Sequence, residues 1–517
     1  MSAVSSHRLQ VGQRLIQQAS TFLASKRLIW LIVGFGIMIR FIQYLADRSL
    51  WLDESLLVLN ITHRTFAGLL QPLDNGQAAP VGFLLLERLV VQIFGSSEYA
   101  LRLVPFLAGC VALVLFYRVA VACIKPEAVP IALLLFAISG PLIYYSSEVK
   151  QYSCDVAIAL LLLLMAIDVY PKKLTALRVA ILAVVGAGAL WFSHPAVFVL
   201  GGIGAGLGLC CILKRDWKYL RSLLVVYLCW TVSFISNYLV SLRYISSNQA
   251  LQGFWNDAYM PLLPHSLSDL HWFIDTFFTI FQNPVGLGPY AAGIAALLFL
   301  VGSVVLYRAR RERFWLLLAP IFLALFASGL HKYPFGGRLL LFAAPVLILL
   351  IAHGLQQVSA RVGNGRIATV AILGVLCIDP VISATYMVVR PSTKEEVRPA
   401  LAYIHAHMQP GDLLYVYYGA QYAFEYYQED NKYAIQQYQI GTSARDNWNA
   451  YVDELNRLRG NQRVWFLFSH VRRKEGVDEE KFFLYQLDQI GPRLDTFTVT
   501  GASVYLYNLK DQALNHQ

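Results

Sequence analysis

Charged residues are scarce in this chain of 517 residues. They make up 14% of the sequence, whereas hydrophobic residues make up 57% and the mean hydropathy is +0.51. Soluble domains carry roughly 25% charged residues, so this balance excludes a soluble globular protein and indicates a polytopic membrane protein. The formal net charge of +10 does not point to nucleic acid, because Lys and Arg lie in short clusters between apolar runs, where they set topology.

Cysteines are few and are badly placed for a disulfide framework. All seven fall in or at the ends of apolar runs, none lies in the C-terminal region, and there is no CxxC pair. Neither a disulfide framework nor a zinc signature is therefore expected. The sequence also lacks an internal repeat, which disfavours transporter folds built from inverted repeats.

A cleavable signal peptide is not evident. Residues 1–25 are polar, and the first apolar run, 28–46, is long enough to span a bilayer and to stay attached. Ten further runs follow, so we expect about eleven spans: 28–46, 101–123, 128–145, 153–169, 178–193, 196–213, 219–240, 289–307, 313–330, 338–355 and 366–388.

The basic clusters fix the orientation of these spans. With a cytoplasmic N-terminus, nearly every cluster falls in a cytoplasmic loop, as the positive-inside rule requires. These clusters are Lys125; Lys172, Lys173 and Arg178; Lys214, Arg215, Lys218 and Arg221; Arg308, Arg310, Arg311 and Arg313; and Arg361 and Arg366.

Two amphipathic segments of the first outer loop are not counted as spans. The run 80–95 is short for a span and carries Glu87 and Arg88 at its middle, and counting it would invert every later loop. We expect this run and residues 55–70 to be helices that lie in the outer membrane interface. The loop would then be a platform with Asp53 and Glu54 at its start.

The composition changes after residue 388. A helical stretch ends at Pro410-Gly411, an alternating run follows at 413–418, and a second helix is expected over 444–459 before the strand "RVWFLF". The segment "DTFTVTGASVYLYNL" reads as a hairpin that turns at Gly501. We therefore predict a membrane domain over 1–388 and a small extracytoplasmic α/β domain over 389–517.

Polar residues gather in the outer loops, on the same side as Asp53. They include Glu148, Lys150 and Tyr152 in "YYSSEVKQYS", His194, Arg243 and Asp257, and His331, Lys332 and Arg338 in "HKYPFGGR". Carboxylates in two places and cations in several are typical of a site where an acid or base works beside an anion clamp.

Several motifs, in order, resemble glycosyltransferase family 39, which includes protein O-mannosyltransferases and lipid A aminoarabinose transferases. They are "WLDESLL", "PVGFLLLERLVVQIFGSSEYALRLVPFLAGCVALVLFYRV", "ISGPLIYYSSEVKQYS" and "YPFGGRLLLFAAPVLIL". The resemblance implies a GT-C fold in a bacterial cytoplasmic (inner) membrane. It also implies an inverting transfer of a hexose or pentose from a polyprenyl-phosphate donor to a lipid, glycan or protein acceptor, at the outer face of the cell envelope.

The resemblance implies a role for each matching residue. Asp53 matches the general base, and Glu54 completes the acidic pair, tuning that base or orienting the acceptor. Glu148 matches the acidic position after the third span and holds the acceptor or a cation. Arg338 matches the Arg that stabilises the departing phosphate. Lys150, Tyr152, His194, His331 and Lys332 are further substrate-binding candidates.

The chain departs from the family pattern in two places. Where the family often has a basic residue followed by two prolines, this chain has "QAAP", with Gln77 and a single Pro80. Where many bacterial members have Arg in the acidic turn, it has Lys150, which keeps the charge but loses the bidentate fork. The resemblance therefore implies no phosphate or sugar contact from the "QAAP" position, and Lys150 leaves a different donor head group open.

Each assignment has a simpler structural alternative. Asp53 could cap the helix that follows it, Glu148 and Lys150 could be a solvated pair, and Arg338 could be a snorkelling span end. His194 could be an ordinary helix-end residue, and the tyrosines at 144, 145 and 152 an interfacial belt. Arg40 lies inside the first span, either near the site or paired internally.

A second function class and a possible cofactor also stay open. A multi-span transporter or lipid flippase is the second function class, although it predicts ionisable pairs near the bilayer midplane. No cofactor is certain: a divalent cation held by the separated carboxylates and His194 is left open, because no ligand spacing is diagnostic.

Overall fold

The computed structural model describes residues 26–169, 172, 174–362, 365–429, 433, 435–445, 447–474 and 476–510. Its chain divides into two compact units. The helical body consists of the described residues up to Ala46 with Thr65–Gly95 and Tyr99–Pro391. The C-terminal unit begins at Ser392 and also includes Asp47–Arg64 and Ser96–Glu98. The N-terminal 25 residues and Lys173 lie outside the described residues.

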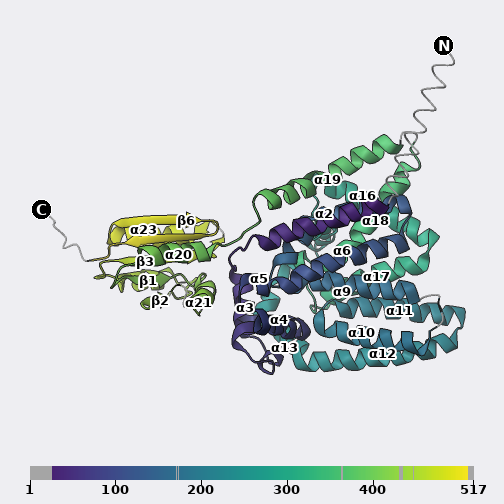
Figure 1. The fold of residues 1–517 in the computed structure, drawn as a ribbon, viewed down its shortest axis with the longest axis horizontal. Coiled ribbons are helices and arrows are strands. Elements are labelled where there is room, and N and C mark those ends of the chain that lie inside the picture. The colour runs from purple at the N-terminus through teal and green to yellow at the C-terminus, as the bar shows by residue number, and fades with distance from the viewer. Residues whose placement is uncertain are drawn as a thin grey trace, which may run out of the picture. The chain divides into compact units, whose positions relative to one another are not determined.

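The helical body is a bundle of long apolar helices (Figure 1). Within the described residues, nine helices are long and apolar enough to cross a membrane. They begin with α2 (Lys26–Leu45), α6 (Leu103–Cys123), α9 (Tyr152–Val169), α11 (Ala196–Lys214) and α12 (Trp217–Asn237), the last continued to Ser247. The others are α16 (Pro289–Ala309), α17 (Arg311–Gly329), α18 (Ala344–Ser359) extended back to Gly337, and α19 (Gly365–Val389).

The two remaining predicted spans are also helical. The run 128–145 is a pair, Pro126–Ile138 and Gly140–Ser147, bent by 59°. It consists of η3 (Pro126–Ala128), α7 (Val129–Ile138), α8 (Gly140–Tyr144) and η4 (Tyr145–Ser147). The run 178–193 is α10 (Ala176–Phe192), which has 17 residues. All eleven apolar runs are therefore found as helices, and the predicted multi-span fold is confirmed.

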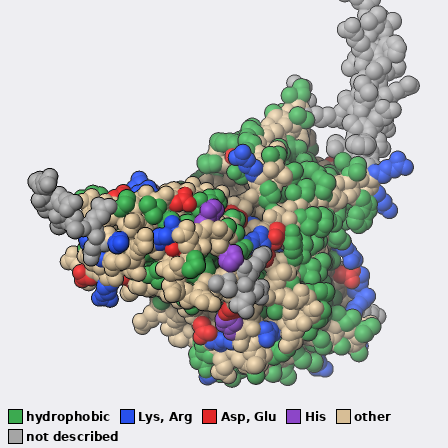
Figure 2. Space-filling model, turned by 60° about the vertical axis from the view of Figure 1, so that its left-hand side comes forward, with side chains coloured by type: hydrophobic (Ala, Val, Ile, Leu, Met, Phe, Trp, Pro, Cys, Tyr) green, Lys and Arg blue, Asp and Glu red, His purple; other side chains and the backbone are tan. Residues whose placement is uncertain are grey.

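Small residues let the central helices approach closely. A Cβ atom on Gly354 of α18 would lie 1.9 Å from the carbonyl oxygen of Leu298, and one on Gly302 of α16 would lie 2.1 Å from that of Leu350. Backbones in contact through glycine are typical of helix pairs in lipid, where tight packing replaces the hydrophobic effect. Outside this core, hydrophobic side chains cover much of the body's surface (Figure 2), as a lipid-facing surface requires.

Short elements connect the spans of the helical body. After α2 come η1 (Gly68–Leu70), η2 (Asp74–Gly76), the predicted interfacial helix α4 (Val81–Phe94), and α5 (Glu98–Leu101). Between α12 and α16 lie the π-helical turn η5 (Tyr238–Leu242), α13 (Arg243–Ser247), α14 (Gln249–Phe254), η6 (Asn256–Ala258) and α15 (Leu267–Gln282). The 3-10 helix η7 (Gly337–Ala343) leads into α18.

A five-stranded mixed sheet forms the core of the C-terminal unit (Figure 1). Its order is β2-β1-β3-β7-β6, with β1 parallel to β2 and β3, and β7 antiparallel to β3 and β6. The strands are β1 (Leu413–Val416), β2 (Tyr438–Ile440), β3 (Val464–Ser469), β6 (Arg493–Val499) and β7 (Ala502–Tyr507). Short strands β4 (Arg473–Lys474) and β5 (Val477–Asp478) pair separately.

The predicted elements of this unit are present. They are α20 (Val397–His407), β1, α22 (Trp448–Asn456), β3, and the hairpin of β6 and β7, which turns at Gly501 with φ of +67°. Five elements that the sequence did not predict are α21 (Gln421–Glu429), β2, β4, β5 and α23 (Glu479–Ile490). The α/β class is thus confirmed, whereas 389–517 as a self-contained domain stays a prediction.

The helix that carries the acidic pair differs from the prediction. Instead of one interfacial helix over 55–70, α3 spans Leu52–His63 and ends where Arg64 turns extended, before η1 begins. It packs against α21 within the C-terminal unit. The first outer loop is therefore not one continuous platform, because Asp47–Arg64 folds with sequence more than three hundred residues away.

Candidate active site

The acidic pair occupies the first turn of α3. Asp53 is half-buried and Glu54 is buried. The residue before the helix is Trp51, which makes no side-chain cap. The cap is supplied instead by Glu395, whose Oε2 accepts the backbone N–H of Leu52 at 2.9 Å. Asp53 is therefore not the capping residue, and the positive end of the helix dipole favours its carboxylate form.

Further hydrogen bonds fix the segment before α3. The hydroxyl of Tyr427 accepts the backbone N–H of Leu50 at 2.8 Å, and Ser49 Oγ donates to Glu396 Oε2 at 2.9 Å. Arg398 binds Asp47 at 3.0 Å and Glu98 at 2.9 Å. At the other end of α3, His63 pairs with Glu429. The acidic pair thus lies on a helix held at both ends by the C-terminal sequence.

Trp51 adds an aromatic contact at the same point. The ammonium of Lys394 lies 3.4 Å from the centroid of its ring, and the ring of His470 lies 6.5 Å away. His470 Nδ1 in turn lies 2.7 Å from Glu395 Oε1, so one carboxylate joins the start of α3 to the residue after β3. Cation–π and charge-assisted contacts of this kind order the backbone on which Asp53 is carried.

The acidic turn after the third predicted span belongs to the helical body. Glu148 and Lys150 are both buried, with exposed fractions of 0% and 3%. This burial excludes the solvated ion pair as their description. Lys150 Nζ donates to Gln77 Oε1 at 2.9 Å. Lys150 therefore lies beside the "QAAP" segment, where the family often has a basic residue and this chain has none.

Arg338 meets this turn through an aromatic residue. Its guanidinium lies 5.6 Å from the ring centroid of Tyr152 and 5.7 Å from that of Trp255. Arg338 is half-buried, and its guanidinium packs on aromatic rings of the helical body. Tyr152 also contacts Tyr145 edge-on at 5.1 Å, and Tyr145 contacts Tyr144 at 5.3 Å. The tyrosines therefore form a packed cluster. Trp255 was not among the predicted site residues.

Three buried polar side chains belong to the middle of α4, the first turn of α9 and the loop after α10. Neither carboxylate oxygen of Glu87 has a hydrogen-bond partner among the described residues, and burial raises the pKa of Glu87 well above its usual value. His194 follows α10, and burial lowers its pKa to about 4. Asp155 of α9 neighbours Ser193. His194 is therefore a neutral imidazole near pH 7 and adds no cation to the anion clamp.

The other candidate cations lie elsewhere. His331 and Lys332 are exposed after α17, and the His331 ring packs on Tyr259 at 4.7 Å. Arg243 is exposed and contacts Tyr244. Arg40 is buried and donates to the carbonyl oxygens of Gly36, Ala137 and Phe136 at 3.0–3.4 Å. Of the two descriptions of Arg40, internal pairing is the one observed.

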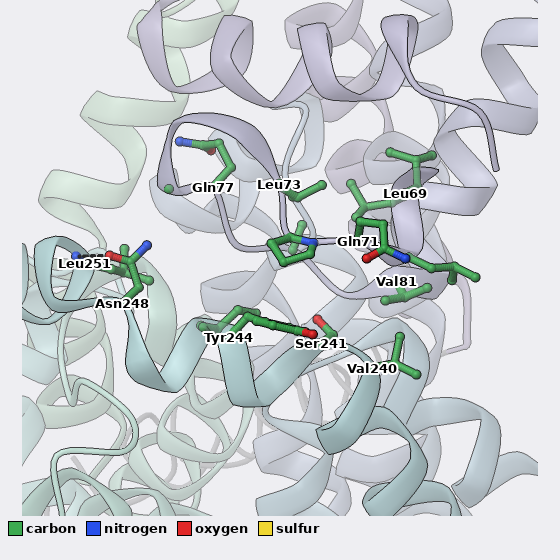
Figure 3. Close-up of a pocket in the computed structure, with 16 residues that line it drawn as sticks. Leu69, Gln71, Leu73, Gln77, Val81, Val240, Ser241, Tyr244, Asn248 and Leu251 are labelled. Atoms are coloured by element: carbon green, nitrogen blue, oxygen red, sulfur yellow. Dashed lines mark hydrogen bonds between the residues drawn. The ribbon is translucent and has the colours of Figure 1, made fainter. Parts of the chain in front are cut away.

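A small cavity lies beside Gln77 (Figure 3). Its volume is about 60 Å³, and its lining joins residues 69–84 of the first outer loop to residues 240–251, with Gln71, Gln77, Ser241, Tyr244 and Asn248 as polar members. Waters, each with about 30 Å³ in the liquid, suit this volume better than a sugar ring. The cavity beside Gln77 is therefore too small for a sugar ring.

Metal ligands do not converge in the described part of the chain: it has no group of three or more His, Cys, Asp and Glu side chains placed to hold an ion. The seven cysteines are all free thiols.

Comparison with known proteins identifies the fold. No protein-family model and no curated protein matches the chain. Among solved structures, ArnT from Cupriavidus metallidurans bound to undecaprenyl phosphate is similar, with a TM-score of 0.54, 15% identity, and coverage of 93% of this chain and 98% of that one.

The apo ArnT structure gives a TM-score of 0.53 at 15% identity, over 92% and 97% of the two chains. The Archaeoglobus fulgidus oligosaccharyltransferase in complex with Zn and sulfate gives 0.54 at 13% identity, over 93% and 73%. The chain has a GT-C fold. The fold class expected from the sequence is thereby confirmed, over more than nine-tenths of the chain.

Proposed function

We propose that this protein is an integral-membrane glycosyltransferase. It moves a sugar from a polyprenyl-phosphate donor to a lipid, glycan or protein acceptor at the outer face of the membrane. The observation that carries the proposal is the contact of the Arg338 guanidinium with the rings of Trp255 and Tyr152, of which Tyr152 lies two residues after the buried Lys150. This is preorganised positive charge in a fold that is also found in a protein bound to undecaprenyl phosphate.

The chemistry assigns one role to each group. The Asp53 carboxylate takes the proton of the acceptor hydroxyl while that oxygen bonds to the anomeric carbon. The bond from this carbon to the phosphate oxygen breaks, its electron pair leaves with the lipid phosphate, and the configuration inverts. Arg338 and Lys150 stabilise the phosphate charge that develops. Glu148 orients the acceptor. Glu54, the next residue in the first turn of α3, tunes the Asp53 base.

A substitution at the proposed base tests the function directly. Asp53→Asn keeps the size of the side chain but cannot accept the proton, and loss of a general base costs roughly 10² to 10⁴-fold in rate. The measurement is release of polyprenyl phosphate from a radiolabelled polyprenyl-phosphate sugar in membranes that hold the natural acceptors. Asp74→Asn, an exposed carboxylate in the same outer loop, is the matched control. Full activity of Asp53→Asn at normal folded yield would exclude this base.

The transporter alternative makes a different prediction. Purified protein in liposomes would then take up or flip the lipid-linked sugar without forming a covalent product. Arg40, the charged residue inside the first span, donates to backbone carbonyls, and among the described residues it forms no ion pair of the kind that transport sites use. This contact favours the transferase.

A further inference from the structure

A second, larger pocket lies in the outer loops of the helical body. Its volume is about 490 Å³, within the range of small-molecule sites. One wall is α15, another is the segment from Phe254 to Ala258, and the third is the segment from Phe335 to Gly337. Two hydrogen bonds join the walls: Trp272 Nε1 donates to the Asp257 carbonyl at 3.0 Å, and the Phe335 N–H donates to that of Ala258 at 2.8 Å.

The helix α15 has two chemically distinct faces. The pocket-lining residues Trp272, Asp275, Thr276 and Thr279 recur at helical spacing on one face. On another, Leu267, Leu270, Ile274 and Phe278 recur at the same spacing and are exposed. A helix with a polar face and an exposed apolar face lies in the membrane interface. The pocket therefore opens at the depth where the head group of a membrane lipid lies.

The lining chemistry selects a sugar. Trp255 and Trp272 offer flat apolar faces on which the C–H face of a sugar ring can stack. Asp257, Asp275 and Asn283 offer acceptors for hydroxyl groups, and neither carboxylate forms an ion pair with any residue that the structure describes. Carboxylates accept charge-assisted hydrogen bonds from hydroxyl and ammonium donors. The carboxylate of a uronic acid has no donor and has the same negative charge, so it would be repelled.

The pocket adjoins the proposed anion clamp. Gly336 and Gly337 line it, Arg338 follows them directly, and the Arg338 guanidinium lies over Trp255, a pocket residue. Gly337 has φ of +52°, which favours glycine. A phosphate at Arg338 would thus have its substituent beside the tryptophans.

We propose that this pocket binds the sugar of the lipid-linked donor, and that this sugar is a neutral or amino sugar. The inference rests on the proposed function, because it places the donor phosphate at Arg338. The two carboxylates supply selectivity for hydroxyl and amino groups, the tryptophans supply the stacking surface, and the apolar face of α15 contacts the lipid.

The test measures the increment in affinity that the sugar provides. Full-length protein in lipid nanodiscs is titrated with undecaprenyl phosphate, and then with undecaprenyl phosphate carrying glucose, a 4-amino-pentose or glucuronic acid. We expect the neutral or the amino sugar to bind at least about 10-fold tighter than the bare lipid phosphate, and the uronic acid to gain nothing. The double variant Asp257→Asn/Asp275→Asn should lose the increment and bind the bare lipid unchanged.

Control variants separate the pocket from the clamp. His271→Gln changes an exposed residue of α15 outside the pocket lining and should keep the increment. Arg338→Gln should weaken the bare lipid and the glycolipids alike. An unchanged increment in the double variant, no increment for any sugar in the native protein, or a uronic acid bound as tightly as glucose would overturn the pocket assignment.

The two proposals fail in different ways. If the native protein bound no undecaprenyl phosphate, the proposed function would be contradicted. The pocket would then be judged with the soluble methyl glycosides of glucose and the amino-pentose, read by tryptophan fluorescence. A response lost in the double variant would keep the pocket, and no response to either glycoside would overturn it as well.

Discussion

The carboxylate of Glu395 caps the helix that carries Asp53, by accepting the Leu52 N–H at 2.9 Å across 343 residues of sequence. The same carboxylate bonds to His470, whose ring lies beside Trp51. The start of α3 is thereby fixed by residues of the C-terminal sequence. A helix start ordered in this way fixes the direction of the side chain one residue further on, which for a general base is part of its efficiency. Contacts within the C-terminal unit, to which α3 belongs, therefore hold the backbone that carries Asp53, the proposed base.

Removal of this cap should impair turnover more than binding. Glu395→Ala leaves the Leu52 N–H without its acceptor, which costs about 1 kcal/mol at a helix N-terminus. We expect kcat for sugar transfer to fall several-fold with the KM for the donor unchanged, because the donor's proposed contacts are in the helical body. Steady-state kinetics with the radiolabelled donor measure both parameters.

A neighbouring carboxylate provides the control for that experiment. Glu425 of α21 is in the same unit, and its carboxylate accepts a hydrogen bond from Gln421 of its own helix at 2.8 Å. Glu425→Ala should therefore leave kcat as it is. A Glu395→Ala protein that is less stable yet turns over normally would show that the cap serves folding alone.

Lys150 should determine affinity for the donor phosphate. Lys150→Met removes a buried cation and its hydrogen bond to Gln77, so we expect the KM for the donor to rise about 10-fold or more, as for a lost charged hydrogen bond. Lys150→Arg keeps the charge and should recover part of the affinity. Binding of bare undecaprenyl phosphate provides a second readout, and equal affinity in the native and Met proteins would argue against a phosphate contact.

The membrane part was predictable because its signal is local. An apolar run of spanning length has few other solutions in lipid, and each of the eleven runs is found as a helix or a bent pair. The hairpin at Gly501 was predictable for a similar reason, since alternation and a turn glycine lie within fifteen residues. The short helix α21 was missed because it has only nine residues, too few for a helical period to be recognised in the sequence.

The site was predictable only in part. Acidic and basic residues could be assigned to the outer side, but the contacts that define their roles join distant segments. Glu395 to Leu52, Lys150 to Gln77 and Arg338 to Trp255 leave no trace in either local sequence. The first of these contacts joins α3 to the C-terminal unit, whereas the sequence predicted a helix in the membrane interface. No pattern within residues 47–64 predicts this association.

Stability should fall in acid because of His194. Burial lowers its pKa from 6.5 to about 4, so between these values the unfolded chain binds a proton that the folded protein does not. The free energy of unfolding therefore decreases as the pH falls through this window, by on the order of 3 kcal/mol in total, and His194 contributes nothing above pH 6.5. His194→Gln should flatten the decline in thermal stability from pH 7 to pH 5, measured in detergent by tryptophan fluorescence. His265→Gln, an exposed histidine, should leave the native slope.

Glu87 should produce the opposite pH dependence. Its pKa is raised above 4.5 by burial, so above pH 4.5 the unfolded chain releases a proton that the folded protein retains. The free energy of unfolding therefore decreases as the pH rises, up to the pKa in the folded protein. Glu87→Gln imitates the neutral carboxyl group and removes this penalty. We expect the variant to melt at a higher temperature than the native protein at pH 8, and the difference to shrink towards pH 4.5. Glu127→Gln, at an exposed position, is the control, and a Glu87→Gln protein less stable than the native one at pH 8 would mean that the carboxyl group is ionised and held by a partner.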